Sequence, residues 1–181
     1  MKQAKTYNVL PEGRQPDIWD KLMHLPVLRL LNPFFQKHRK VLMYLFFGAV
    51  TTVISLGLQF TLIPWFESFA EDGSEEQKWL AQIAKLLAWI ITVLAAFLTN
   101  RVWVFDAKTT GAAAYIRQLL SFYGSRVATY GVEALAMFVF YQTLQYNFYV
   151  VTVVTSIVVV ILNYIFSKLF VFAKKKDATK Q

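Results

Sequence analysis

Three ionisable side chains, those of Lys85, Arg126 and Glu133, lie inside stretches of sequence that are otherwise apolar. The planar guanidinium group of an arginine can donate two hydrogen bonds to one phosphate group. A carboxylate accepts hydrogen bonds from sugar hydroxyls or pairs with a lysine. Each charge costs about 3 kcal/mol or more at the centre of a lipid bilayer, so such residues face a bundle interior and are functional by default. An arginine without a carboxylate partner indicates anion binding, and phosphate fits it best.

Four long apolar segments must position these side chains. Hydrophobic residues make up 56% of the 181-residue chain, and no charge occurs between Lys40 and Glu67 or between Glu133 and Lys168. A hydrocarbon core of about 30 Å is crossed by roughly 20 helical residues. The valine-rich last segment would suit a strand in water, but in lipid a helix satisfies its own backbone hydrogen bonds. We therefore expect an all-α integral membrane protein with four transmembrane helices, at about residues 41–65, 79–101, 118–141 and 148–168.

The basic residues indicate how these helices are oriented. Eight Lys and Arg lie in residues 1–40, three in 101–117 and five in 168–181, whereas residues 67–78 contain five acids and one Lys. Positively charged loops remain in the cytoplasm. Both termini and the middle connection are therefore expected there, in a multi-pass protein of the cell membrane. The net charge of +8 is then a signal of topology and of contact with membrane lipids, and nucleic acid is not an expected partner.

Three regions follow from this topology. Residues 1–39 are expected to form a cytoplasmic arm, which is either a proline-broken helix at the membrane interface or a loosely ordered tail. Residues 40–173 form the transmembrane domain, and residues 174–181 form a basic cytoplasmic tail. His24 and His38 stand apart in the sequence and the chain has no cysteine. Neither a metal site nor a cofactor is therefore expected.

One sequence pattern occurs twice, each time at the end of a predicted helix. Residues 96–105 read AFLTNRVWVF and residues 163–172 read NYIFSKLFVF. The beginnings of the two preceding hairpins also correspond, with YLFFGAVTT at 44–52 and LSFYGSRVA at 120–128. Because each unit is a two-helix hairpin, its ends return to the same side of the membrane. The two halves are therefore expected to be parallel repeats, related by an axis along the membrane normal.

These features resemble the GtrA-like family of small four-helix membrane proteins. The family's first-helix pattern F-x-x-x-G is similar to YLFFG at residues 44–48, and its repeated ending N-[FY]-x-x-N-[RK]-x-[WF]-x-F is similar to both endings above. The chain departs from the pattern at Ala96, where the leading Asn is usual, and at Ser167, which replaces the inner Asn. The resemblance covers about residues 40–173. It implies translocation of polyprenyl-phosphate-linked sugars for cell-surface polysaccharide synthesis. A related eukaryotic group is a non-catalytic subunit of dolichol-phosphate mannose synthase.

The ionisable residues can be given roles within such a bundle. Lys85 and Glu133 lie at similar depth, about 10 Å below the outer ends of their helices, so we expect them to form an ion pair. Arg126 is then left to bind the phosphate of a lipid-linked sugar, with Arg101 and Lys168 assisting at the cytoplasmic mouth. A polar layer for the sugar hydroxyls is expected from Glu133, Lys85, Gln59, Asn100 and Asn163.

Each of these roles has a structural alternative. Arg126 could cap free backbone carbonyls or contact an ordinary phospholipid. The side chains of Arg101 and Lys168 could serve only as anchors among the lipid headgroups, like the aromatic residues beside them. Asn100 and Asn163 could join neighbouring helices through hydrogen bonds.

Two functions fit the sequence. The first is a flippase that moves a polyprenyl-phosphate-linked monosaccharide across the membrane for cell-surface polysaccharide or teichoic acid glycosylation. We expect a homo-oligomer, because four helices enclose little space. The second is a non-catalytic subunit that anchors or stabilises a membrane-associated polyprenyl-phosphate glycosyltransferase. An enzyme is not expected, since the sequence shows no large extramembrane domain, Gly-rich phosphate loop or metal-ligand spacing. Export of small cationic drugs through Glu133 would not explain the surplus of basic residues around it.

Overall fold

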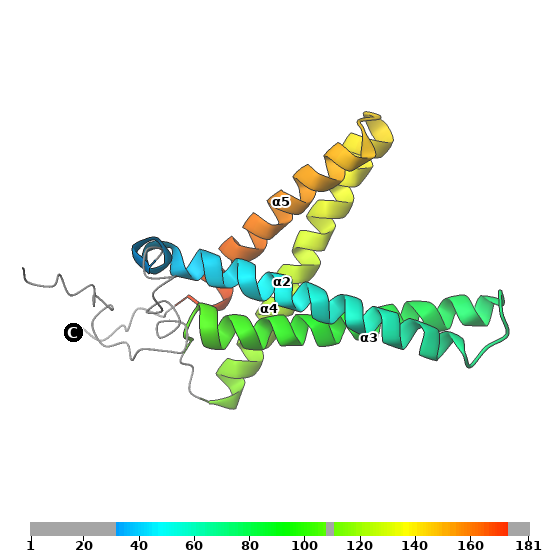
Figure 1. Cartoon of the computed structure of the whole chain (residues 1–181), viewed down its shortest axis with the longest axis horizontal. Coiled ribbons are helices and arrows are strands. Elements are labelled where there is room, and N and C mark those ends of the chain that lie inside the picture. The colour runs from blue at the N-terminus through cyan, green and yellow to red at the C-terminus, as the bar shows by residue number, and fades with distance from the viewer. Residues whose placement is uncertain (1–31, 108–110, 174–181) are drawn as a thin grey trace, which may run out of the picture. The chain divides into compact units, whose positions relative to one another are not determined.

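The computed structural model describes residues 32–107 and 111–173, and within these ranges the chain is helical without any strand. Its four long helices are α2 (Asn32–Glu67), α3 (Glu75–Thr99), α4 (Ala112–Ala136) and α5 (Phe148–Phe166) (Figure 1). Three π-helical segments continue the last three helices, namely η2 (Asn100–Val104), η3 (Met137–Thr143) and η4 (Ser167–Val171). The expected interfacial helix and the basic tail fall in residues 1–31 and 174–181, outside the described residues.

The chain divides into two compact units, Met1–Arg39 and Lys40–Gln181. The backbone of α2 leaves helical geometry at His38, with φ of −111° and ψ of 15°, directly before this boundary. In the first unit, the described residues form the start of α2, where the Phe34 and His38 rings lie 4.9 Å apart. The second unit contains the remainder of α2 and all the other helices.

Three helical segments are long and apolar enough to cross a membrane. They are Asn32–Glu67, Glu75–Val104 and Phe148–Val171, with 36, 30 and 24 residues. The fourth expected span, residues 118–141, also forms a helix, made by α4 and η3, but it is not among these three. It contains Arg126 and Glu133 together with several hydroxyl and amide side chains, which lower its hydropathy. An all-α chain with apolar helices of membrane length is therefore confirmed for the described residues.

Helices α3 and α5 each begin with a side-chain cap at the end of the loop that precedes them. The Ser74 hydroxyl accepts a hydrogen bond from the backbone N–H of Gln77 at the start of α3, and two acidic residues follow in the first turn. The Asn147 side chain accepts hydrogen bonds from the backbone N–H groups of Tyr149 and Val150 at the start of α5. Such caps satisfy N–H groups that have no partner inside the helix. Both loops, residues 68–74 and 144–147, are called outer loops below.

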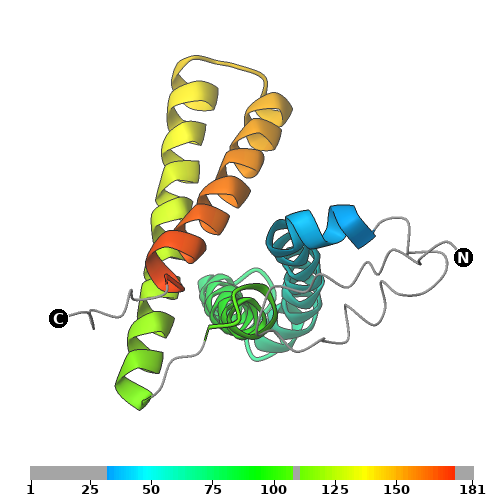
Figure 2. The same ribbon diagram turned by 90° about the vertical axis from the view of Figure 1, so that its left-hand side faces the viewer.

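Helices α2 and α3 form one hairpin, and α4 and α5 form a second one in which the helices pack along each other. The hairpins meet on the side away from the outer loops, called the inner side below. There the Trp89 and Tyr123 rings lie 5.8 Å apart and the Phe97 and Phe122 rings 5.5 Å apart. From this region the hairpins diverge toward their outer loops, as Figures 1 and 2 show.

Aromatic residues form the core on the inner side of the second unit. Phe97 and Phe122 are completely buried, and Phe105 and Phe172 are nearly so. The Phe172 ring stacks on Phe105 at 5.0 Å and contacts the rings of Phe97 and Phe122 at 5.8 and 6.0 Å. In contrast, residues 130–143 contain no buried residue. The packing that holds the hairpins together is thus concentrated at their inner ends.

The two repeated sequence endings adopt the same backbone form. Each is a π-helical turn, closed by the N–H of Phe105 donating to the Asn100 carbonyl and by the N–H of Phe172 donating to the Ser167 carbonyl, both at 2.9 Å. Isolated π-helical turns are frequent at functional sites. Phe105 and Phe172 occupy equivalent positions of the two endings and stack on each other. The ring of Tyr164 contacts Phe105 at 6.1 Å, which matches the contact between Phe97 and Phe172 at 5.8 Å.

Candidate functional site

Arg126 lies on the inward face of α4, one helical turn after the buried Phe122. Its guanidinium carbon is 4.6 Å from the centre of the Phe122 ring, a cation–π contact. Its Nη1 atom lies 3.5 Å from the hydroxyl oxygen of Tyr44 on α2. Among the described residues, the one ion pair joins Lys78 to Glu75. No described carboxylate therefore neutralises Arg126. The guanidinium is half-buried, with hydrogen-bond donors left for an anion.

Two tyrosines connect Arg126 to Lys168. The ring of Tyr44, which is 6% exposed, lies edge-on to the ring of Tyr164 at 5.3 Å. The ammonium nitrogen of Lys168 lies 5.8 Å from the centre of the Tyr164 ring. The four residues come from α4, α2, α5 and η4, and we call them the cation–tyrosine cluster. Two positive charges and two phenol hydroxyls thus gather where the inner ends of three helices meet.

The sequence predicts roles for Arg126 and Lys168 but none for the two tyrosines. Both stand in motifs that the sequence itself shows. Tyr44 begins the YLFFG pattern, and Tyr164 is the second residue of the second repeated ending. An aromatic residue in a motif at a membrane interface is most often an anchor, so sequence alone gave no reason to single them out.

Arg101 lies with the first turns of α4. Its guanidinium carbon is 4.7 Å from the centre of the Tyr115 ring, and its Nε atom donates to the side-chain oxygen of Gln118 at 3.3 Å. These contacts tie η2 to α4. The three cations expected at the phosphate therefore have different surroundings. Arg126 lies next to Tyr44 and Lys168 next to Tyr164, whereas Arg101 contacts Tyr115.

Three polar side chains of the two endings are buried, those of Asn100, Asn163 and Ser167. The Asn163 side-chain oxygen accepts a 2.9 Å hydrogen bond from the Thr129 hydroxyl, which joins α5 to α4. This is the helix–helix contact considered as the alternative for Asn163. The side-chain oxygen of Asn100 and the hydroxyl of Ser167 occupy equivalent positions in the two endings, and neither has a hydrogen-bond partner among the described residues. Two polar atoms are therefore left unsatisfied at the start of the two π-helical turns.

The remaining expected site residues lie nearer the outer loops. Gln59 is half-buried, and its side-chain nitrogen donates to the Ser55 hydroxyl at 3.1 Å within α2. Lys85 is exposed on α3 and Glu133 is half-buried on α4. The expected ion pair between Lys85 and Glu133 is wrong for a single chain, since no such pair exists among residues 32–107 and 111–173. The reason is that α3 and α4 separate beyond their inner contacts, so equal depth does not bring the two side chains together (Figure 1).

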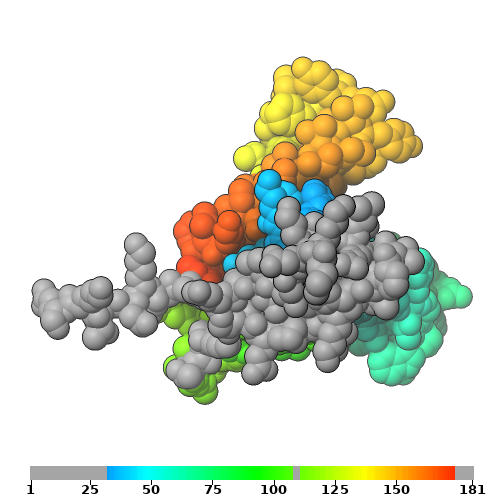
Figure 3. All heavy atoms as spheres, turned by 60° about the vertical axis from the view of Figure 1, so that its left-hand side comes forward, coloured from blue at the N-terminus to red at the C-terminus, as the bar shows by residue number. Residues whose placement is uncertain are grey.

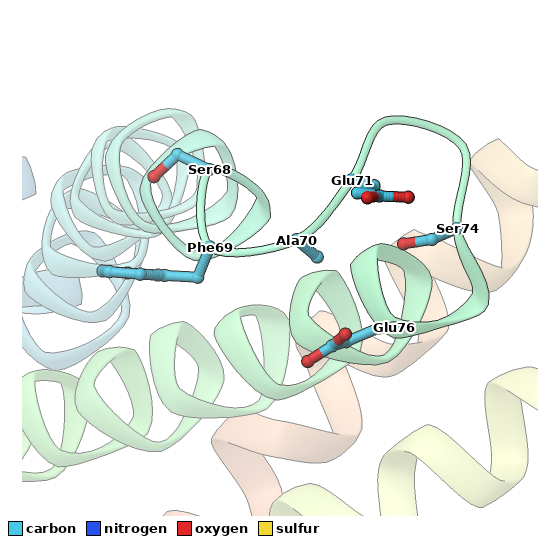
Figure 4. Close-up of a pocket in the computed structure, with 6 residues that line it drawn as sticks. All are labelled: Ser68, Phe69, Ala70, Glu71, Ser74 and Glu76. Carbon is cyan, nitrogen blue, oxygen red and sulfur yellow. The ribbon is translucent and has the colours of Figure 1, made fainter.

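A recess of about 410 Å³ lies at the outer loop between α2 and α3 (Figure 4). Its lining comprises Ser68, Phe69, Ala70, Glu71, Ser74 and Glu76. Two carboxylates and no cation make it unsuitable for a phosphate. Within the described residues, no group of three or more His, Cys, Asp or Glu side chains could hold a metal ion. The cation–tyrosine cluster is therefore the better candidate for an anionic ligand.

Long apolar helices that hold a cluster of cations and phenols define a multi-pass helical membrane protein with a polar site. The chain matches the family model described as "GtrA/DPMS, transmembrane domain" over residues 43–172. The protein belongs to this family, as the repeated endings had suggested.

Several relatives are similar over most of their length. One is the "Cell wall teichoic acid glycosylation protein GtcA" of Listeria monocytogenes serovar 1/2a, with 32% identity over 75% of this chain and 86% of the relative. A second protein of that name from Listeria monocytogenes is 32% identical over 83% of this chain and 98% of the relative. The "Uncharacterized membrane protein YwcD" of Bacillus subtilis is 28% identical over 75% of this chain and 98% of the relative. No solved structure matches the chain.

Proposed function

We propose that this protein is a flippase that moves a polyprenyl-phosphate-linked monosaccharide across the cell membrane for glycosylation of teichoic acid or another cell-surface polysaccharide. Its family and its similarity to teichoic acid glycosylation proteins support a role in glycosylation. The observation that carries the proposal is the environment of Arg126. A half-buried guanidinium in a membrane helix, without a carboxylate among the described residues, is a site for an anion.

The phosphate binds at the cation–tyrosine cluster. Arg126 donates two hydrogen bonds to phosphate oxygens, and Lys168 supplies a second positive charge. Arg126 donates toward the oxygen of Tyr44, which leaves the phenol hydrogen of Tyr44 free to donate to the phosphate. The sugar hydroxyls meet the polar layer of Gln59, Glu133, Lys85, Asn100 and Asn163, while Arg101 attracts the headgroup on the inner side. The polyprenyl tail stays among the lipid chains, so the protein covers only the headgroup.

The topology that we propose has both termini in the cytoplasm and the two hairpins as parallel repeats. The positive charges of residues 101–117 and 168–181 support this orientation. The common π-helical form of both endings and the matching ring contacts support the repeat. The cation–tyrosine cluster then lies on the cytoplasmic side, where a lipid-linked sugar is made before it crosses the membrane.

Reconstitution of the purified protein in liposomes tests the proposal. Vesicles receive a short-chain polyprenyl-phosphate-linked sugar, and its appearance in the opposite leaflet is followed with and without the protein. We expect movement that needs no partner protein and that Arg126→Ala abolishes. Arg117→Ala is the matched control, because Arg117 is an exposed cation on the same helix. Movement at the wild-type rate by Arg126→Ala would exclude this mechanism.

The second candidate function is that of a non-catalytic subunit of a membrane-associated polyprenyl-phosphate glycosyltransferase. The family description, which joins GtrA with DPMS, favours it. Co-expression with such a transferase separates the two functions. A subunit raises the stability or activity of the transferase and moves no lipid by itself, whereas a flippase moves lipid in vesicles that contain no other protein.

A further inference from the structure

Lys85 and Glu133 both face the space between the diverging hairpins. Lys85 lies one helical turn outward from Trp89, and the Trp89 ring contacts Tyr123 of α4. Residues four apart share one face of a helix, so Lys85 is on the side of α3 that faces α4. Glu133 follows Phe122 by 11 residues on α4, about three helical turns, and the Phe122 ring contacts Phe97 of α3. Glu133 therefore also points inward rather than away from the other helices.

The two charges lie at nearly equal distances along their helices from the contact between the hairpins. The contact between Phe97 and Phe122 provides a common reference level on α3 and α4. From that level, Lys85 is 12 residues outward along α3 and Glu133 is 11 residues outward along α4. At 1.5 Å per residue these steps amount to about 18 and 17 Å. Two opposite charges thus lie equally far along their helices from the contact between the hairpins, on helices that have separated.

Neither charge has a partner within its own chain among the described residues. The described ion pair joins Lys78 to Glu75, outside the apolar part of α3. A single ionised side chain in the hydrocarbon region is costly, so charged residues there pair with each other or line a polar cavity. Residues 52–67 and 130–143 contain no buried residue, so the outer halves of α2 and α4 leave room for neighbours. Figure 3 shows that the outer end of the α4–α5 hairpin, in yellow, extends beyond the rest of the visible chain.

We propose that the protein forms a twofold homodimer in which Lys85 of each copy pairs with Glu133 of the other. A twofold interface is self-complementary, because the same patch meets itself in reverse. One chain offers one cation and one carboxylate at equal distance from the contact between its hairpins, so two copies form two identical pairs and leave no charge over. An unrelated partner would have to supply both an anion for Lys85 and a cation for Glu133. The second copy therefore supplies the residue that completes the polar layer around each Glu133.

Exchanging the charges between two differently tagged chains tests this pairing. One chain carries Lys85→Glu and the other carries Glu133→Lys, and both are expressed together. In a dimer of like chains, both pairs become repulsive, whereas in the mixed dimer both pairs are again opposite in sign. We expect purification through one tag to recover mixed dimers in at least about tenfold excess over either dimer of like chains. A random distribution of like and mixed dimers, or wild-type protein that is monomeric in the membrane, would overturn the proposal.

The chain offers a matched control outside the apolar region. Lys78→Glu and Glu75→Lys exchange the charges of an exposed pair within one chain, so they should give the random distribution. If the charge variants fail to accumulate, cross-linking in intact membranes decides the question. The protein has no cysteine, so Lys85→Cys and Glu133→Cys on differently tagged chains can be joined by a short bismaleimide. Leu135→Cys, on the opposite face of α4, should not cross-link to Lys85→Cys, and equal cross-linking of both would contradict the pairing.

These experiments use no substrate. Failure of the dimer and failure of lipid transport are therefore separate results, and the dimer does not depend on the proposed flippase activity.

Discussion

Replacing Arg126 by alanine should weaken binding of a polyprenyl phosphate by about two orders of magnitude. The guanidinium has one donor directed to the Tyr44 hydroxyl at 3.5 Å and one face against the Phe122 ring. The remaining N–H groups can donate to a phosphate, and hydrogen bonds between charged groups contribute about 1.5–3 kcal/mol each. Two such bonds, less the hydration that the phosphate regains when released, give about 3 kcal/mol, or roughly 100-fold in the dissociation constant.

Native mass spectrometry of protein in small detergent micelles measures this loss directly. Polyprenyl phosphate is titrated into wild type, Arg126→Ala, Arg126→Lys and the control Arg117→Ala. Lysine keeps the charge but lacks the planar pair of donors, so Arg126→Lys should bind about 10-fold more weakly than wild type, for a loss of one hydrogen bond. Arg117→Ala should bind like wild type, because Arg117 is exposed near the start of α4.

Loss of Arg126 also removes the cation–π contact with Phe122, which is worth about 1 kcal/mol. Circular dichroism and size-exclusion chromatography must therefore show that Arg126→Ala is folded before its affinity is interpreted. Folded Arg126→Ala with wild-type retention of polyprenyl phosphate would refute the assignment. Arg126→Lys with wild-type affinity would refute the two-bond geometry and leave a simple charge effect.

Three further predictions concern stability and stoichiometry. Thr129→Val should lower the free energy of unfolding by about 1 kcal/mol in a detergent–SDS titration, since it deletes the buried hydrogen bond to Asn163. Phe172→Ala should lower the same free energy by about 3 kcal/mol, because its ring contacts Phe97, Phe105 and Phe122. Phe170→Ala, at a position 70% exposed, should change it by less than about 0.5 kcal/mol. Native mass spectrometry should find one polyprenyl phosphate per chain, since Arg126 occurs once in each. Two per chain would contradict a single cluster.

The positions of the helices could be predicted because the local sequence determines them, and the two repeated endings are visible in the sequence itself. Apolar runs without charge, such as the one from Val41 to Phe66, must become helices in lipid whatever they pack against. The π-helical form of the two endings could not be predicted, although the sequence shows that the endings are similar. A π-helical turn differs from an α-helical one by a single hydrogen-bond register, and residue types at Asn100 or Ser167 do not distinguish the two registers.

The arrangement of the helices was predicted less well than their positions. Distance along a helix follows from residue number, so equal depth of Lys85 and Glu133 was predicted from the sequence. Whether the two helices stay together at that level depends on which side chains pack between them. Large rings at Phe97 and Phe122 hold the inner ends together, and further out α3 and α4 separate. Tyr44 and Tyr164 were missed for a similar reason, because their contact joins residues 120 positions apart in the sequence.

The two repeats differ where the candidate site lies, and this difference indicates one site per chain. When the hairpin beginnings are aligned on their glycines, Arg126 corresponds to Val50. When the endings are aligned, Asn163 corresponds to Ala96. The second hairpin therefore carries polar groups where the first is apolar. The first hairpin contributes Tyr44, whose hydroxyl accepts a hydrogen bond from Arg126, so we expect a single asymmetric site in each chain.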